Sequence, residues 1–150
     1  ARQDALALLD FYEAVAEEKH IRLRVEGDGE IEGDRLMFRR AVSNLLSNAL
    51  RHAPEAGEVT IRIAATAQAT TVTVENTGAD IDAKTLPRLF DRFYRADASR
   101  AHTDTDGSGL GLAITRAIAE AHGGSVTASS GQGHTCFTLV FPYHIAKPSS

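Results

Sequence analysis

The sequence predicts an α+β domain built as a two-layer sandwich, in which about three helices cover one face of a mixed, mostly antiparallel sheet of about five strands. Three observations predict this class. The chain has 150 residues, a length typical of one globular domain. Residues 59–63 and 71–75 both alternate apolar and other residues, as neighbouring antiparallel strands do. Helix and strand segments do not alternate strictly, which disfavours an all-parallel sheet.

The N-terminal half begins with a helix over residues 4–19, followed by a half-buried strand over residues 21–25. Gly27, Gly29 and Gly33 indicate a loop or short edge strand, after which Asp34 is placed to cap a long helix that ends near Ala53, before Pro54. The apolar arc of that helix is expected to face the core. It consists of Phe38, Val42, Leu45, Leu46, Ala49 and Leu50.

After the two central strands, a turn is expected at residues 76–78 and a short helix at residues 86–90. Residues 97–109 are polar and show no periodicity, so we expect a mobile loop. A helix over residues 110–122 ends at Gly123 and Gly124, and strands at residues 125–129 and 135–141 complete the sheet. The domain is thus residues 1–142, with a lid at about 91–108 and a tail at 143–150.

Composition and charge exclude several kinds of function. The net charge of −4 does not favour nucleic-acid binding, and no apolar run approaches the roughly 20 residues that span a bilayer. The single cysteine, Cys136, excludes an internal disulfide and is expected to be a small buried residue rather than a nucleophile. The sequence does not begin with Met, so we expect a fragment, monomeric by itself, of a longer protein.

Two segments have the spacing of a binding site. Asn44 and Asn48 lie four residues apart on one helix face, one turn before Arg51 and His52, at the edge of the apolar arc. Such a stripe is either a pocket wall or a solvated helix face, and its spacing alone does not decide between them. Glycines also open the helix that starts near residue 110, where backbone N–H groups could bind phosphate, although similar turns occur as plain loops. This second segment is Gly107-Ser108-Gly109-Leu110-Gly111.

Four motifs in a fixed order carry a resemblance that extends over nearly the whole chain. They are the asparagine helix with Asn44-Leu45-Leu46-Ser47-Asn48, then Val74-Glu75-Asn76-Thr77-Gly78, then Leu89-Phe90-Asp91-Arg92-Phe93-Tyr94-Arg95, and the glycine segment. Together they resemble the N, G1, F and G2 boxes of the catalytic and ATP-binding domain of sensor histidine kinases. That domain has the Bergerat-type α/β sandwich fold, which is also found in gyrase B, the ninety-kilodalton heat-shock chaperone and the mismatch-repair ATPases.

The resemblance implies a set of site residues for Mg-ATP. Asn48 would bind Mg²⁺ through its side-chain oxygen, with Asn44 contributing to the same ion, because this hard cation prefers oxygen ligands. Arg51 and His52 would face the phosphates. The lid arginines would reach the terminal phosphate, and the glycine segment, including Ser108 and Leu110, would supply amides and flexibility. These arginines are Arg95 and Arg100, of which Arg100 could also be a plain surface charge.

The position of Asn44 resembles the one at which hydrolysing relatives carry a glutamate that activates water. An amide cannot act as a general base, so we expect slow hydrolysis. The family instead transfers the γ-phosphate to a histidine on a separate dimerising helical hairpin, from which it passes to a response regulator. No segment of this chain resembles that hairpin. By this resemblance the parent is a homodimer in the bacterial inner membrane and the present domain is cytoplasmic. The alternatives are a slow clamp-type ATPase and a degenerate nucleotide-binding or docking module.

The chain departs from the family pattern in the region expected to bind adenine. The family motif Asp-x-Gly-x-Gly is here Asn76-Thr77-Gly78-Ala79-Asp80, so a neutral acceptor replaces a carboxylate and the hydrogen bond to adenine should be weaker. His134 stands before Thr135 where the family usually has glycine, and Thr135 is still expected to line the base pocket. The G1 and F box sequences resemble those of sensor kinases that respond to heavy metals.

Overall fold

The computed structural model describes residues 2–29, 31, 35–78, 81, 84–90 and 111–142. Its elements follow the predicted order. They are α1 (Arg2–Glu18), β1 (Arg22–Gly27), α2 (Arg35–His52), β2 (Glu58–Ala65), β3 (Ala69–Thr77), the 3₁₀ helix η1 (Leu86–Phe90), α3 (Gly111–Ala121), β4 (Ser125–Gly131) and β5 (His134–Pro142).

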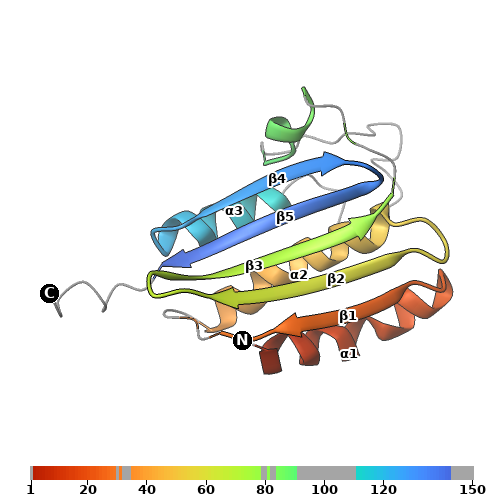
Figure 1. Cartoon of the computed structure of the whole chain (residues 1–150), viewed down its shortest axis with the longest axis horizontal. Helices are drawn as coiled ribbons and strands as arrows, with labels where there is room; N and C mark the ends of the chain where they lie inside the picture. Colours follow the sequence, from red (N-terminus) through yellow and green to blue (C-terminus); the bar gives the residue numbers. More distant parts are fainter. Residues whose placement is uncertain are drawn as a thin grey trace, which may run out of the picture.

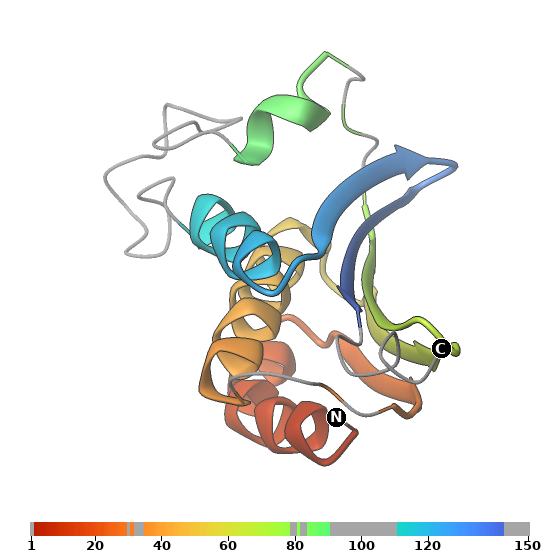
Figure 2. The same ribbon diagram turned by 90° about the vertical axis from the view of Figure 1, so that its left-hand side faces the viewer.

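The five strands form one sheet in the order β1-β2-β3-β5-β4. β1 and β2 are parallel, and the other three pairs are antiparallel. A parallel pair needs a crossover connection, which α2 supplies between β1 and β2. Helices α1, α2 and α3 cover the same face of the sheet, and the described residues place no helix on the other face (Figures 1 and 2). The predicted two-layer sandwich with a mixed, mostly antiparallel sheet is confirmed.

The core lies between α2 and the central strands. Every member of the predicted apolar arc of α2 is at most 3% exposed. Alternate residues of β3 and β5 face this arc, so that Val72, Val74 and Leu139 are fully buried. Phe38 of α2 packs edge-to-face on Phe141 of β5, with their ring centroids 5.5 Å apart. This packing fixes the rotation of α2 and therefore the direction of its polar stripe.

Helices α1 and α2 lie side by side and run in the same direction. Asp4 accepts a 2.7 Å ion-paired hydrogen bond from Arg39 near their starts, and the Tyr12 hydroxyl lies 2.7 Å from the Ser43 hydroxyl in the middle. Near their ends, the Lys19 ammonium contacts the last turn of α2. The C-terminal ends of both helices therefore meet at the same end of the sheet.

The glycine pair after α3 ends that helix as predicted. Gly123 has a φ of 79°, and the Gly124 N–H donates to the Ala119 carbonyl at 2.8 Å, which is the pattern of a glycine-terminated helix. Gly124 also passes close to β5, because a Cβ at this position would lie 1.7 Å from the Val140 carbonyl oxygen. Only glycine fits this junction between α3 and β4.

Three expectations differ from the structure in detail. Cys136 is half-buried rather than part of the core, because its place in β5 points it to the helix-free face of the sheet. The turn expected at residues 76–78 begins only at Gly78, since β3 continues through Thr77. The short helix at residues 86–90 is a 3₁₀ helix.

The predicted lid at 91–108 and tail at 143–150 lie outside the described residues. No helix in the described part of the chain is long and apolar enough to cross a membrane.

Candidate functional site

The polar stripe of α2 faces the start of α3. Asn48 is 5% exposed and Asn44 is half-buried, so neither side chain belongs to a fully solvated helix face. The Asn44 amide nitrogen donates to the Gly111 carbonyl at 3.1 Å, and the Thr115 hydroxyl donates to the same carbonyl at 3.0 Å. Asn44 therefore joins α2 to the first residue of α3, and this bond leaves its amide oxygen available as an acceptor.

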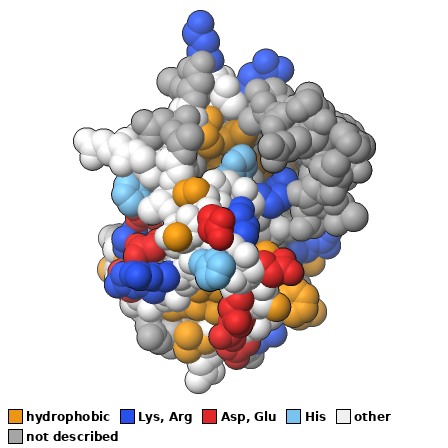
Figure 3. All heavy atoms as spheres, turned by 90° about the vertical axis from the view of Figure 1, so that its right-hand side faces the viewer, with side chains coloured by type: hydrophobic (Ala, Val, Ile, Leu, Met, Phe, Trp, Pro, Cys, Tyr) orange, Lys and Arg blue, Asp and Glu red, His pale blue; other side chains and the backbone are white. Residues whose placement is uncertain are grey.

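The last turn of α2 carries the predicted phosphate partners Arg51 and His52, both of which are exposed. The surroundings of the His52 imidazole disfavour a proton on it. Its pKa is lowered mainly by desolvation, and then by the positive charges of Arg51 and Lys19. Figure 3 looks onto this end of the molecule, where histidine and other basic side chains lie beside a hollow with hydrophobic atoms in its depth.

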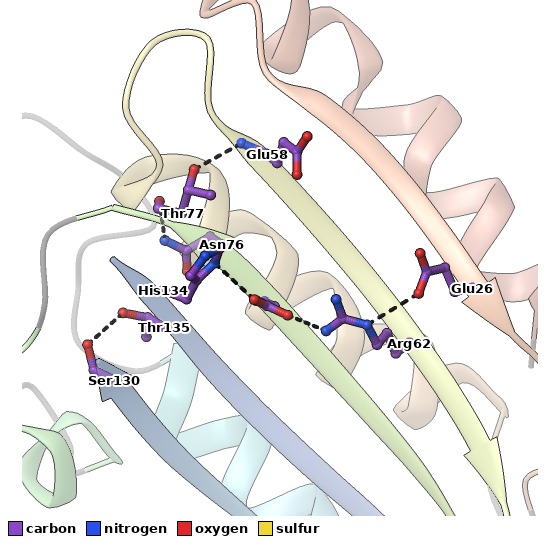
Figure 4. Close-up of polar contacts among 9 residues, drawn as sticks. Glu26, Glu58, Arg62, Asn76, Thr77, Ser130, His134 and Thr135 are labelled. Carbon is purple, nitrogen blue, oxygen red and sulfur yellow. Dashed lines mark hydrogen bonds and ion pairs between the residues drawn. The ribbon is translucent and has the colours of Figure 1, made fainter. Parts of the chain in front are cut away.

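Asn76 and Thr135, both predicted to contact the base, are direct partners in the β3–β5 register and face the helix layer. They are 1% and 2% exposed. The Asn76 amide nitrogen donates to the Thr77 carbonyl at 2.9 Å (Figure 4). Its amide oxygen is buried and has no hydrogen-bond partner among the described residues. An unpaired buried acceptor costs about 1–3 kcal/mol, so its presence at the end of two core strands calls for a ligand with a donor group.

Thr135 organises the segment that follows β3. Its hydroxyl lies 3.0 Å from the Ser130 hydroxyl, which accepts a 2.8 Å hydrogen bond from the Ile81 N–H. Gly78 occupies a conformation with a φ of 153°, and a Cβ there would lie 3.0 Å from the His52 carbonyl oxygen. The backbone of Gly78 thus passes directly beside the C-terminal end of α2, which brings the predicted base-binding and phosphate-binding residues to the same end of the fold.

A chain of ion pairs on the helix-free face of the sheet was not predicted from the sequence. Arg62 of β2 pairs with Glu26 of β1 at 3.3 Å and with Glu75 of β3, and His134 of β5 lies 2.9 Å from the other Glu75 oxygen (Figure 4). Glu75 and His134 directly precede Asn76 and Thr135, so these pairs brace the ends of β3 and β5 from the opposite face. The alternation of the strands indicated that the side chains of the ion pairs point outward, but not that they meet.

The Cys136 thiol lies on the same face of the sheet. Desolvation and then the Glu75 charge raise the pKa of this thiol.

The structure therefore brings together Asn44, Asn48 and Gly111 at one side of the site, and Asn76, Gly78 and Thr135 at the other, with Arg51 and His52 at the end of α2. The remaining predicted residues lie outside the described part of the chain. They are Arg95, Arg100, Gly107, Ser108, Gly109 and Leu110.

Comparison with known proteins shows the family of this chain. Residues 33–145 match the family described as histidine kinase-, DNA gyrase B-, and HSP90-like ATPase. The chain belongs to this family. Its fold is also that of the catalytic domain of histidine kinase ThkA, with a TM-score of 0.81 and 26% identity over 93% of this chain and 90% of that one. The asparagine stripe and the buried Asn76–Thr135 pair thus lie in the fold of an ATPase family, as the four motifs predicted.

Two similar curated proteins are named as a sensor protein and a sensor histidine kinase. The sensor protein IrlS of Burkholderia pseudomallei is 45% identical over 148 residues, which is 97% of this chain and 32% of that protein. The sensor histidine kinase CusS of Escherichia coli O6:H1 is 47% identical over 136 residues, which is 90% of this chain and 28% of that protein. The chain spans about a third or less of the length of these relatives.

Proposed function

We propose that this domain binds Mg-ATP between α2 and the adjoining ends of β3 and β5, and presents the γ-phosphate to a histidine on another domain of a sensor histidine kinase. The observation that carries the proposal is the buried, unpaired amide oxygen of Asn76 beside Thr135. This oxygen provides one buried acceptor for a ligand. Across from it, α2 carries the two asparagines Asn44 and Asn48, and the C-terminal end of α2 carries Arg51 and His52.

The orientation of the Asn76 amide favours adenine over guanine. Its nitrogen is held by the Thr77 carbonyl, which leaves the oxygen to meet the ligand. Adenine presents an exocyclic amino group, a donor, where guanine presents a carbonyl oxygen, an acceptor. An acceptor held in place against a second acceptor would leave both unpaired, at a cost of about 1–3 kcal/mol. The domain should therefore discriminate against GTP although the family's carboxylate is absent.

The side chains on α2 are of a kind that would hold a magnesium ion bound together with the nucleotide. Asn48 and Asn44 offer neutral amide oxygens, which Mg²⁺ accepts together with phosphate oxygens and water. When bound, Mg²⁺ neutralises charge on the triphosphate. The chain's own residues then hold the phosphates: Arg51 and His52 lie at the end of α2, and Arg95 and Arg100 are proposed to reach the terminal phosphate from the lid.

The residue at position 44 favours transfer over hydrolysis. Asn44 donates to the Gly111 carbonyl and cannot take a proton from water, so the domain lacks a general base at the position where hydrolysing family members carry glutamate. We propose that the phosphate is accepted by a histidine of a dimerising helical hairpin and then by a response regulator. The name of the relative CusS, a sensor histidine kinase, supports this assignment. We also propose a membrane-bound parent, of which this is the cytoplasmic domain. The G1 and F box sequences favour the heavy-metal sensor subgroup.

Transfer of label from [γ-³²P]ATP to an added helical hairpin with an acceptor histidine tests the proposal. We expect acid-labile label on the hairpin that requires Mg²⁺ and falls sharply in the Asn48→Ala variant. Gln68→Ala removes an exposed amide from the β2–β3 turn and should leave labelling unchanged. ATP that binds without any label on the histidine, or rapid ATP hydrolysis without an acceptor, would contradict the proposed transfer.

A further inference from the structure

Lys19 lies outside every predicted motif, at the junction of α1, α2 and the loop that leads into β2. Its ammonium donates to the Leu50 carbonyl at 2.9 Å and to the Arg51 carbonyl at 3.4 Å. Its own backbone carbonyl accepts from the Ala56 N–H at 2.8 Å. The residue that follows α1 therefore contacts both the last turn of α2 and the loop after it.

We infer that Lys19 is a positioning residue for nucleotide binding, because it fixes the end of α2 that carries Arg51 and His52. The inference rests on the proposed function, in which these two side chains face the phosphates. Lys19 would act through α2 and would not touch the nucleotide, since its ammonium is directed at backbone carbonyls.

The need for such a residue follows from how helices end. The last four carbonyls of a helix lack partners within the helix. In α2 the Ala49 carbonyl is satisfied by the Ala53 N–H at 2.9 Å, and Lys19 contacts the next two carbonyls along the chain. A cation at this end also offsets the negative end of the helix dipole. Lys19 thereby performs both tasks from the turn that follows α1.

The charge of Lys19 also acts through space on His52. It adds to that of Arg51, and both charges contribute to lowering the His52 pKa. Lys19 lies just after α1, and Arg51 lies in the last turn of α2. On the adjoining loop, Glu55 lies 3.2 Å from His20. An approaching triphosphate would meet a basic cluster whose geometry is held by Lys19.

Calorimetric titration with Mg-ATP tests the inference on the wild-type chain and three variants. In Lys19→Met we expect the Kd to rise about three- to tenfold, the effect of losing charge-assisted bonds that order a binding element. Lys19→Arg, which keeps the charge and the donors, should stay within about twofold of wild type. Arg22→Met is the matched control, because Arg22 is a 78%-exposed cation at the start of β1 that pairs only loosely with Glu58, at 3.7 Å. It should bind like wild type.

A second readout separates positioning from general stability. In the nucleotide-free chain, NMR titration of the His52 imidazole should give a higher pKa in Lys19→Met and in Lys19→Gln, because a positive charge is removed, and no change in Arg22→Met. Lys19→Gln removes the charge but keeps an N–H group that can donate to the α2 carbonyls, and it is used if Lys19→Met does not fold. Equal Kd values for the uncharged Lys19 variant and Arg22→Met, with an unchanged His52 pKa, would overturn the role of Lys19 but leave the proposed function standing. Absence of Mg-ATP binding by the wild-type chain would overturn the proposed function and, with it, the inference.

Discussion

Replacing Asn76 with leucine separates the stability of the domain from its proposed ligand binding. Leucine has nearly the same shape as asparagine, with methyl groups in place of the amide oxygen and nitrogen. Removal of the unpaired buried oxygen recovers about 1–3 kcal/mol, and loss of the bond from the amide nitrogen to the Thr77 carbonyl costs about 0.5–1.5 kcal/mol. The balance is a free energy of unfolding higher by about 1 kcal/mol in the absence of nucleotide.

The same substitution should weaken ATP binding about tenfold, because adenine loses its acceptor. At an ATP concentration one hundred times the wild-type Kd, the ligand stabilises the wild-type domain by about 2.7 kcal/mol and the Asn76→Leu variant by about 1.4 kcal/mol. Urea unfolding with and without Mg-ATP, followed by circular dichroism, measures all four free energies. The family-like Asn76→Asp variant is the matched control, and should show the opposite pattern, with lower stability alone and a larger gain from ATP.

A nucleotide-free stability of Asn76→Leu that is lower than wild type by more than about 1 kcal/mol would show that the amide oxygen has a stabilising partner, and would refute its unpaired state. An ATP-dependent gain equal to that of wild type would refute its role in base binding.

Three further predictions concern the rest of the fold. Gly124→Ala should destabilise the domain by more than about 2 kcal/mol in urea unfolding, because its Cβ meets the Val140 carbonyl, whereas Gly131→Ala, with no atom within 4 Å of the added Cβ, should change stability by less than about 0.5 kcal/mol. The lowered pKa of His52 means that the unfolded chain takes up a proton at a higher pH than the folded chain, so stability should fall as the pH drops below the ordinary value of 6.5. Unfolding at pH 7.5 and 5.5 should show a smaller fall in His52→Gln. Alkylation of Cys136 by iodoacetamide at pH 8 should be slower in the folded than in the urea-unfolded chain, because burial raises the thiol pKa, and equal rates would contradict this.

Much of the fold could be predicted because its signals are local. The apolar arc of α2 fixed which face of that helix is buried, and with it the direction of Asn44 and Asn48. Gly123 and Gly124 end a helix through their own backbone conformation and close approach to β5. The buried face of a helix follows from residues a few positions apart. The end of a helix can follow from a glycine, because few other residues adopt the conformation needed there.

The details that decide the site depend on pairing between distant segments. Asn76 faces Thr135 only because β3 pairs with β5 in one register, and 58 residues lie between Asn76 and Thr135 along the chain. The same register brings His134 to Glu75 on the other face. Lys19 reaches α2 because α1 packs parallel to it, which no local pattern indicates. The alternation of apolar and polar residues in β3 and β5 was therefore sufficient to orient the side chains of these strands, but not to show which residues pair.

Calorimetric titration of the chain with ATP, with and without Mg²⁺, is the most direct test of the central claim that α2 and the ends of β3 and β5 form an Mg-ATP site. We expect one-site binding that weakens when Mg²⁺ is removed and in Asn48→Ala, and that is weaker for GTP than for ATP. No binding at millimolar ATP, or binding indifferent to both Mg²⁺ and Asn48→Ala, would contradict it.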